Sequence, residues 1–145
     1  SINFALNNDD GLSTKNYGTA DIILTGVSRS GKTPTCLFLA LQYGIYAANY
    51  PLIEEDLDTS RLPNVLQGYK SKLYGLSINP VRLQNIRDER RSNSGYASIE
   101  QCQKEVRRAE DMFVQNDVPF IDTSHISIEE IAGRILQKSK LERRY

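Results

Sequence analysis

Residues 26–33 of the chain read Gly26-Val27-Ser28-Arg29-Ser30-Gly31-Lys32-Thr33. They fit G-x-x-x-x-G-K-[ST], the phosphate-binding loop of many nucleotide-using proteins. Because so short a pattern also occurs by chance, its flanks decide what it means. An apolar, branched run at 21–25 precedes the loop and predicts a buried strand, and residues 33–41 read as a helix that should end near Gly44. This order of strand, glycine-bounded loop and helix favours a phosphate site over a plain glycine turn.

The residue types of this loop suit phosphate for separate reasons. Gly26 and Gly31 can take backbone angles closed to other residues and leave room for a phosphate to approach. The N–H groups of the loop can turn inward as a nest, and the N-terminus of the following helix adds partial positive charge. We therefore expect all of residues 26–33 to bind the nucleotide. Lys32 supplies a charge for the terminal phosphates, and the Thr33 hydroxyl is placed to ligate Mg²⁺.

Strand and helix patterns alternate along the rest of the chain. Further strands are expected at 45–50, 73–78 and 118–122, and further helices from Pro80, from the capping box at 98–101 and from Ser127. Pro51 should stop the second strand, and the acidic segment 52–58 reads as a solvated loop. Alternating strands and helices indicate a parallel sheet covered on both faces. We therefore predict one α/β domain, a three-layer sandwich of the P-loop NTPase type with about four mainly parallel strands.

Composition narrows the partners and the compartment. The chain of 145 residues carries 18 basic and 18 acidic side chains, so no overall field draws it to nucleic acid or to an acidic membrane. No apolar run approaches the roughly 20 residues of a membrane span. Its two cysteines, Cys36 and Cys102, lie far apart and match no metal-binding pattern. Cys36 falls on the apolar side of a predicted helix and should be buried, so we expect a reducing, cytoplasmic location.

Two adjacent carboxylates, Asp9 and Asp10, precede the loop and are followed by Gly11. They could hold Mg²⁺ or accept a proton from a substrate hydroxyl. The same residues also form a common turn that ends in glycine, and spacing alone favours that turn.

Four arginines share one predicted helix, which breaks at 92–95: Arg82, Arg87, Arg90 and Arg91. A segment that closes arginines onto a transferring phosphate is a recurring device, because guanidinium groups neutralise the spreading negative charge. Arg87 and Arg91 are the stronger candidates because they share a helix face at i, i+4. An equally weighted alternative is a solvent-facing helix surface whose arginines pair with Asp88 and Glu89.

Longer segments carry a resemblance to a known family. They read ADIILTGVSRSGKTPTCLFLALQYGIYAANYPL at 20–52, NNDDG at 7–11, LYGLSINPVRLQNIRDERRSNSGYAS at 73–98 and SIEEIAGRILQKSKLERRY at 127–145. Together they resemble the bifunctional kinase/pyrophosphorylase family, which includes bacterial phosphoenolpyruvate synthase regulatory proteins and pyruvate, phosphate dikinase regulatory proteins. Members of this family are substantially longer, so the resemblance implies that residues 1–145 form the C-terminal domain of a longer protein.

The resemblance implies an unusual pair of reactions. Such proteins phosphorylate a threonine of their target enzyme with ADP as the donor, which inactivates the target and releases AMP. They also remove that phosphate with inorganic phosphate, which forms pyrophosphate and reactivates the target. The preferred target has its catalytic histidine already phosphorylated. Within this resemblance, the segments AANYPL and RSNSGYAS favour phosphoenolpyruvate synthase over the dikinase as partner.

Roles for individual residues follow from the same resemblance. The loop at 26–33 matches the nucleotide loop of the family, and 9–11 match its DDG element. A histidine usually precedes that element, and here the position is Asn8, so proton transfer by that histidine is not expected, while acid–base work by Asp10 is unaffected. The reading of the residues themselves adds that Asp9 and Thr33 would hold Mg²⁺, while Lys32, Arg87 and Arg91 would stabilise the transferring charge.

Two other readings stay open at this point. The motifs alone fit a small-molecule kinase equally well, and a non-catalytic nucleotide-binding module fits a chain that lacks the N-terminal half of the family. A homodimer is also left open.

Overall fold

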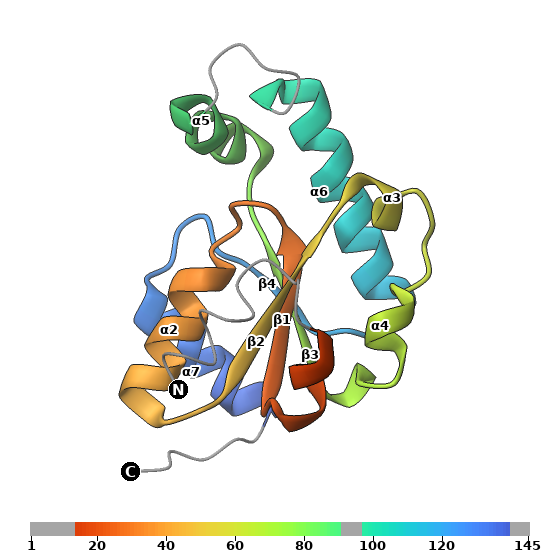
Figure 1. Cartoon of the computed structure of the whole chain (residues 1–145). Coiled ribbons are helices and arrows are strands. Elements are labelled where there is room, and N and C mark those ends of the chain that lie inside the picture. Colours follow the sequence, from red (N-terminus) through yellow and green to blue (C-terminus); the bar gives the residue numbers. More distant parts are fainter. Residues whose placement is uncertain (1–13, 91–96, 140–145) are drawn as a thin grey trace.

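The computed structural model describes residues 14–90 and 97–139 (Figure 1). Its sheet has four strands, all parallel, in the spatial order β2-β1-β3-β4. The strands are β1 (Ile22–Val27), β2 (Ala47–Leu52), β3 (Leu73–Ser77) and β4 (Phe120–Asp122). The predicted parallel sheet of about four strands is therefore confirmed.

Helices cover both faces of this sheet, as expected (Figure 1). One face packs against α2 (Lys32–Tyr43) and α7 (Ile128–Ser139), and the other against α6 (Ile99–Gln115). Short elements lie on the same side of the sheet as α6: η1 (Thr14–Thr19), α3 (Glu54–Leu57), α4 (Asn64–Gln67) and η2 (Lys70–Lys72). Side chains of β1 alternate between the two cores, with Ile22 and Leu24 on the α2 side and Ile23 on the α6 side. The three-layer sandwich follows from this alternation.

The second strand differs from its prediction at both ends. It starts at Ala47 because Gly44, at φ 64°, ends α2 as predicted and the Ile45 N–H still bonds to the Leu39 carbonyl at 3.2 Å. It also continues through Pro51, which is in register with Gly26. The predicted stop at Pro51 was wrong because β2 lies at the edge of the sheet, where a missing N–H leaves no ladder bond unmade.

The acidic segment that was expected to be a loop contains one turn of helix, α3. Its carboxylates fall in the first turn, where the partial positive charge of a helix N-terminus favours them. Asp56 also accepts a hydrogen bond from the Ile53 N–H at 3.1 Å. Local capping therefore stabilises a helical turn in a segment that its composition alone predicted to be a loop.

The connections of the sheet place a crevice at the loop. From β1 the chain passes through α2 to β2 on one side, then crosses over β1 to β3 on the other side. Open α/β sheets bind ligands at such a switch point, outside the carboxyl ends of the strands. Helix α5 (Pro80–Arg90) rises from β3 beyond this edge and packs against α6 (Figure 1). The loop at 26–33 therefore lies between the sheet and α5.

Candidate phosphate-binding site

The loop adopts alternating backbone conformations that suit an anion. Arg29 and Gly31 both have left-handed backbones, with φ of 70° and 99°, and Ser30 lies between them. Alternation of this kind turns successive N–H groups towards one concave side, which is how a nest binds phosphate. A positive φ is uncommon for an arginine. Strain of this kind is often found at functional turns.

Gly26 serves a different purpose from the one expected. Among the described residues Gly31 takes a left-handed conformation and Gly26 does not. A Cβ atom on Gly26 would lie 2.4 Å from the Leu76 carbonyl oxygen. Gly26 therefore lets β1 and β3 approach each other at the base of the loop, and of the two loop glycines only Gly31 takes a left-handed backbone angle.

Side chains from three elements hold the loop in place. The Ser30 hydroxyl donates to the Val27 carbonyl at 2.8 Å, and Thr35, in the first turn of α2, donates to the Gly31 carbonyl at 2.8 Å. The Thr123 hydroxyl, just after β4, lies 3.1 Å from the Ser30 carbonyl oxygen. These contacts fix the loop between α2 and the end of β4, so its N–H groups are oriented before any ligand arrives.

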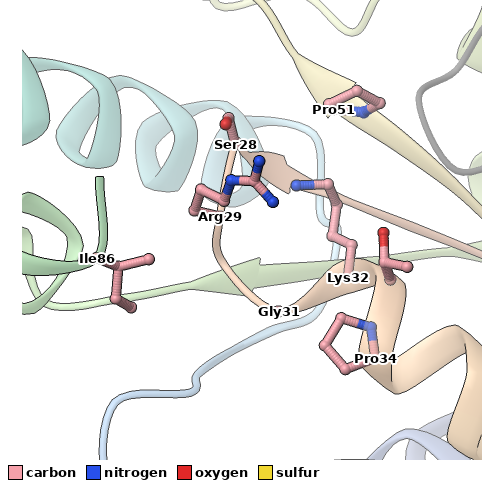
Figure 2. A pocket seen from close by; sticks show the side chains of 8 residues that line it. Ser28, Arg29, Gly31, Lys32, Pro34, Pro51 and Ile86 are labelled. Atoms are coloured by element: carbon pink, nitrogen blue, oxygen red, sulfur yellow. The ribbon is translucent and has the colours of Figure 1, made fainter. Parts of the chain in front are cut away.

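Lys32 is almost completely buried in the wall of the loop. Its side chain is 6% exposed, and its Nζ donates to the Val27 carbonyl at 2.6 Å and to the Ser30 hydroxyl at 3.4 Å. In Figure 2 the charged ends of Lys32 and Arg29 point towards each other above the loop. This pair gives the loop a positively charged face.

A pocket of about 360 Å³ opens on this face (Figure 2). Its lining consists of Ser28, Arg29, Gly31, Lys32, Thr33, Pro34, Pro51 and Ile86. None of these residues is acidic, and two are cationic. Charge, size and exposed loop backbone together suit a polyphosphate. Six of the eight predicted loop residues either line this pocket or, like Val27, hold the Lys32 ammonium with their carbonyl oxygen.

Arg87 lies behind the loop and is completely buried. Its guanidinium pairs with both carboxylate oxygens of Glu105 on α6, at 2.8 and 3.2 Å, and donates to the Ser28 carbonyl at 3.1 Å. The alternative of a solvent-facing arginine paired with Asp88 and Glu89 is therefore wrong for Arg87. The pairing fastens α5, α6 and the first turn of the loop together, and whether Arg87 also contacts a phosphate stays a prediction.

The network of Arg87, Glu105 and Ser28 was not predicted. Glu105 is 18 residues from Arg87 and Ser28 is 59 residues from it. Glu105 also accepts from the Gln101 side chain at 2.8 Å. The sequence showed Glu105 only as one of many charges on a long helix, so no local signal identified it.

Three of the predicted site residues lie outside the described residues: Asp9, Asp10 and Arg91. Their roles stay predictions.

Within the described ranges, no group of three histidine, cysteine, aspartate or glutamate side chains could hold a metal ion. A nucleotide-bound Mg²⁺ needs few protein ligands, because phosphate oxygens and water supply most of them, and Thr33, which lines the pocket, fits this role. No helix in 14–90 or 97–139 is long and apolar enough to cross a membrane.

Comparisons with known proteins identify the family of the chain. The sequence model of the family described as Kinase/pyrophosphorylase matches residues 1–136. A protein of Neisseria gonorrhoeae (strain NCCP11945), named "Putative phosphoenolpyruvate synthase regulatory protein", is 59% identical over 144 residues, which cover 99% of this chain and 53% of that protein. Proteins with the same name from Laribacter hongkongensis and Alkalilimnicola ehrlichii are 58% and 59% identical over 99% of this chain. The chain spans about half the length of the curated relatives it matches. It belongs to the kinase/pyrophosphorylase family.

Proposed function

We propose that this domain transfers phosphate between a nucleotide and a threonine of phosphoenolpyruvate synthase. In one direction the β-phosphoryl group of ADP passes to the threonine hydroxyl, the bond from the bridging oxygen to Pβ breaks, and AMP leaves. In the other direction an oxygen of inorganic phosphate attacks phosphothreonine, the bond from phosphorus to the threonine oxygen breaks, and pyrophosphate leaves. The names of the relatives support the partner, and membership of the family supports the pair of activities.

One observation carries the proposal: the loop presents a buried lysine and two left-handed residues at the switch point of the sheet. Its N–H groups would bind the β-phosphate of ADP or inorganic phosphate, so one cradle serves both directions. An ammonium group has three donors, so Lys32 can exchange contacts with the loop for contacts with phosphate oxygens. Thr33 would bind Mg²⁺, which neutralises charge on the phosphates when it is bound.

The remaining residues would act on the acceptor and on the charge. Asp10 would orient or deprotonate the threonine hydroxyl, and Asp9 would share Mg²⁺ with Thr33. Arg91 is the candidate for direct contact with the transferring group. Arg87 is held by Glu105, so we assign it the task of positioning the loop through the Ser28 carbonyl. The cytoplasm, where its partner enzyme would be met, is the proposed location.

A transfer assay tests the donor and the acceptor together. The chain is incubated with Mg²⁺, histidine-phosphorylated phosphoenolpyruvate synthase and ADP labelled at the β-phosphate, and phosphoamino acids are then separated. We expect label on threonine with an equal amount of AMP, and loss of transfer in Lys32→Ala. Transfer from γ-labelled ATP but not from ADP would show that the donor is wrong.

A second reading gains weight from the length of the relatives, since this chain matches only 53% of the Neisseria protein. In that reading the 145 residues bind the nucleotide but need the rest of a longer protein for transfer. The Neisseria protein, assayed in parallel, separates the two. Transfer by that protein, with ADP binding but no transfer by this chain, would support a binding module.

A further inference from the structure

A second hollow, of about 170 Å³, opens from the phosphate pocket towards β4. Its walls come from the loop and the start of α2, from α5, and from the connection between β4 and α7 together with the start of α7. The lining residues are Arg29, Ser30, Gly31, Pro34, Thr35, Ile78, Arg82, Ile86, Thr123, Ile126, Ile128 and Ile131. We call this hollow the isoleucine cleft.

The lining of the cleft suits a flat, weakly polar ring. Five isoleucines line it, of which Ile78 and Ile131 are buried and Ile128 is 37% exposed. Arg82 also lines the cleft and is itself exposed to solvent, and guanidinium groups stack well on ring faces. No carboxylate lies among the described lining residues. A ring would therefore gain burial on its faces, with a cation available at the rim.

The walls of the cleft are fixed relative to one another. Asn79, just before α5, accepts hydrogen bonds at its Oδ1 from the Val81 and Arg82 N–H groups, at 2.9 and 3.3 Å. Its own N–H donates to the Ser124 hydroxyl at 2.7 Å, and that hydroxyl donates to Asp122 at 2.5 Å. The start of α5 is thereby tied to the connection that follows β4, so the cleft is formed before a ligand binds.

The isoleucine cleft is continuous with the phosphate pocket. The two share four lining residues: Arg29, Gly31, Pro34 and Ile86. Pro34 lies in the first turn of α2, where a nucleotide seated on the loop would place its inner phosphate. Together the two hollows fall within the roughly 300–1,000 Å³ of typical small-molecule sites. The phosphates alone would not fill both hollows, and neither would the nucleoside alone.

We propose that the isoleucine cleft binds the base of the nucleoside diphosphate whose phosphates lie on the loop. This inference rests on the proposed phosphate site. It assigns Ile126, from the connection between β4 and α7, and Ile128, the first residue of α7, to nucleotide affinity. Burial of the base in the cleft contributes to the affinity for ADP, but it contributes nothing to the affinity for pyrophosphate, which has no base.

A competing hollow on the opposite side of the loop is less suited to the base. It measures about 450 Å³ and is lined by Ser28, Leu52, Ile53, Glu54, Arg87, Gln101 and Glu105. It shares only Ser28 with the phosphate pocket. The charge of Glu105 in this hollow is compensated by Arg87, but the carboxylate of Glu54 would repel a polyphosphate placed beside it. The isoleucine cleft, which has no carboxylate among its described lining residues, therefore fits a nucleotide better.

Titration calorimetry with ADP and with pyrophosphate, each with Mg²⁺, tests the assignment. In Ile126→Ala and in Ile128→Ala we expect the dissociation constant for ADP to rise on the order of tenfold, because part of the apolar cover of the base is lost. The dissociation constant for pyrophosphate should stay within about twofold. Ile53→Ala is the matched control: Ile53 is 51% exposed and lines only the competing hollow, so both constants should be unchanged. Thermal unfolding of each variant checks that it is folded, and the half-exposed Ile128 tolerates truncation best.

The outcomes separate the two proposals. If wild type binds both ligands but the two cleft variants leave ADP affinity unchanged, the base lies elsewhere and the phosphate site stands. Weaker ADP binding in Ile53→Ala would move the base to the competing hollow and overturn the cleft. If wild type binds neither ligand, the phosphate site itself fails, and the base pocket fails with it.

Discussion

Replacing Glu105 by alanine should destabilise the fold strongly, because it leaves a buried guanidinium without its carboxylate. The Arg87 side chain is 0% exposed and that of Glu105 is 13% exposed, and both carboxylate oxygens face the guanidinium. In the variant, the Ser28 carbonyl at 3.1 Å remains as an acceptor, but it carries no full charge. The charge of Arg87 would then be compensated only in part.

The expected magnitude comes from the burial of the pair. Removing one partner of a buried ion pair costs about 3–5 kcal/mol, whereas an exposed pair contributes about 0–1 kcal/mol. We therefore expect Glu105→Ala to lower the free energy of unfolding by about 3–5 kcal/mol. For a domain of this size that corresponds to a fall in Tm on the order of 10 °C.

Urea denaturation followed by far-ultraviolet circular dichroism measures this change. Asp58→Ala is the control, since its ion pair with Arg108 joins side chains that are 59% and 43% exposed. That variant should change the free energy of unfolding by less than about 1 kcal/mol. The double variant Arg87→Met with Glu105→Leu should recover most of the lost stability, because apolar side chains of similar volume replace buried ion pairs without loss. A cost for Glu105→Ala no larger than for Asp58→Ala would refute the role assigned to this pair.

Three further predictions concern a tyrosine, a thiol and two glycines. Burial and a neighbouring aspartate raise the pKa of Tyr50 to about 12, so the free energy of unfolding should fall as the pH rises from about 10, where the unfolded tyrosine ionises, to about 12. In urea titrations at a series of pH values, Tyr50→Phe should not show this fall. Burial also raises the pKa of the Cys102 thiol, and both cysteines are buried, so a disulfide reagent should react slowly with the native chain and rapidly in denaturant; fast native reaction would contradict the packing. Gly26→Ala should lower the free energy of unfolding by about 1–3 kcal/mol because its Cβ would meet the Leu76 carbonyl. Gly133→Ala, in open space on α7, should instead raise it by about 0.5–1 kcal/mol. Equal denaturation midpoints for the two variants would refute the tight contact at Gly26.

Much of the fold was predictable because its signals are local. The apolar run before the loop, Gly44 after the first long helix and the cap of α6 each act within a few residues. Gly44 is left-handed and ends α2, and the Ser98 hydroxyl accepts from the Gln101 N–H at 3.1 Å, as predicted. The alternation of strands and helices then implied a parallel sheet with two covered faces, and the structure has this arrangement.

The errors in the predicted fold depend on neighbours that the sequence does not reveal. Pro51 stops a central strand but not an edge strand, and the place of β2 at the edge is set by the whole sheet. Gly26 was predicted to supply a special backbone angle to the loop, yet a glycine is needed there because a Cβ would meet the carbonyl of Leu76, 50 residues further along the chain. Such reasons become visible only when two distant strands meet.

The phosphate loop was the most predictable part of the site, and the arginines were the least. The motif and its flanks located the loop and the left-handed turn at Gly31, whereas the left-handed Arg29 and the burial of Lys32 were not predicted. Helical spacing placed Arg87 on one face of α5 but could not show that α6 covers that face, where Glu105 meets it. The walls of the isoleucine cleft come from separate segments between residues 29 and 131, so no sequence pattern unites them.

The most direct measurement is a crystal structure of the chain grown with ADP and Mg²⁺. We predict that β-phosphate oxygens lie about 2.7–3.2 Å from the Gly31 N–H nitrogen and from the Lys32 Nζ. The position of Asp10 relative to that phosphate would show whether it can reach an acceptor hydroxyl. Ordered ADP with its phosphates away from residues 26–33 would contradict the assignment of this loop as the phosphate-binding centre of the domain.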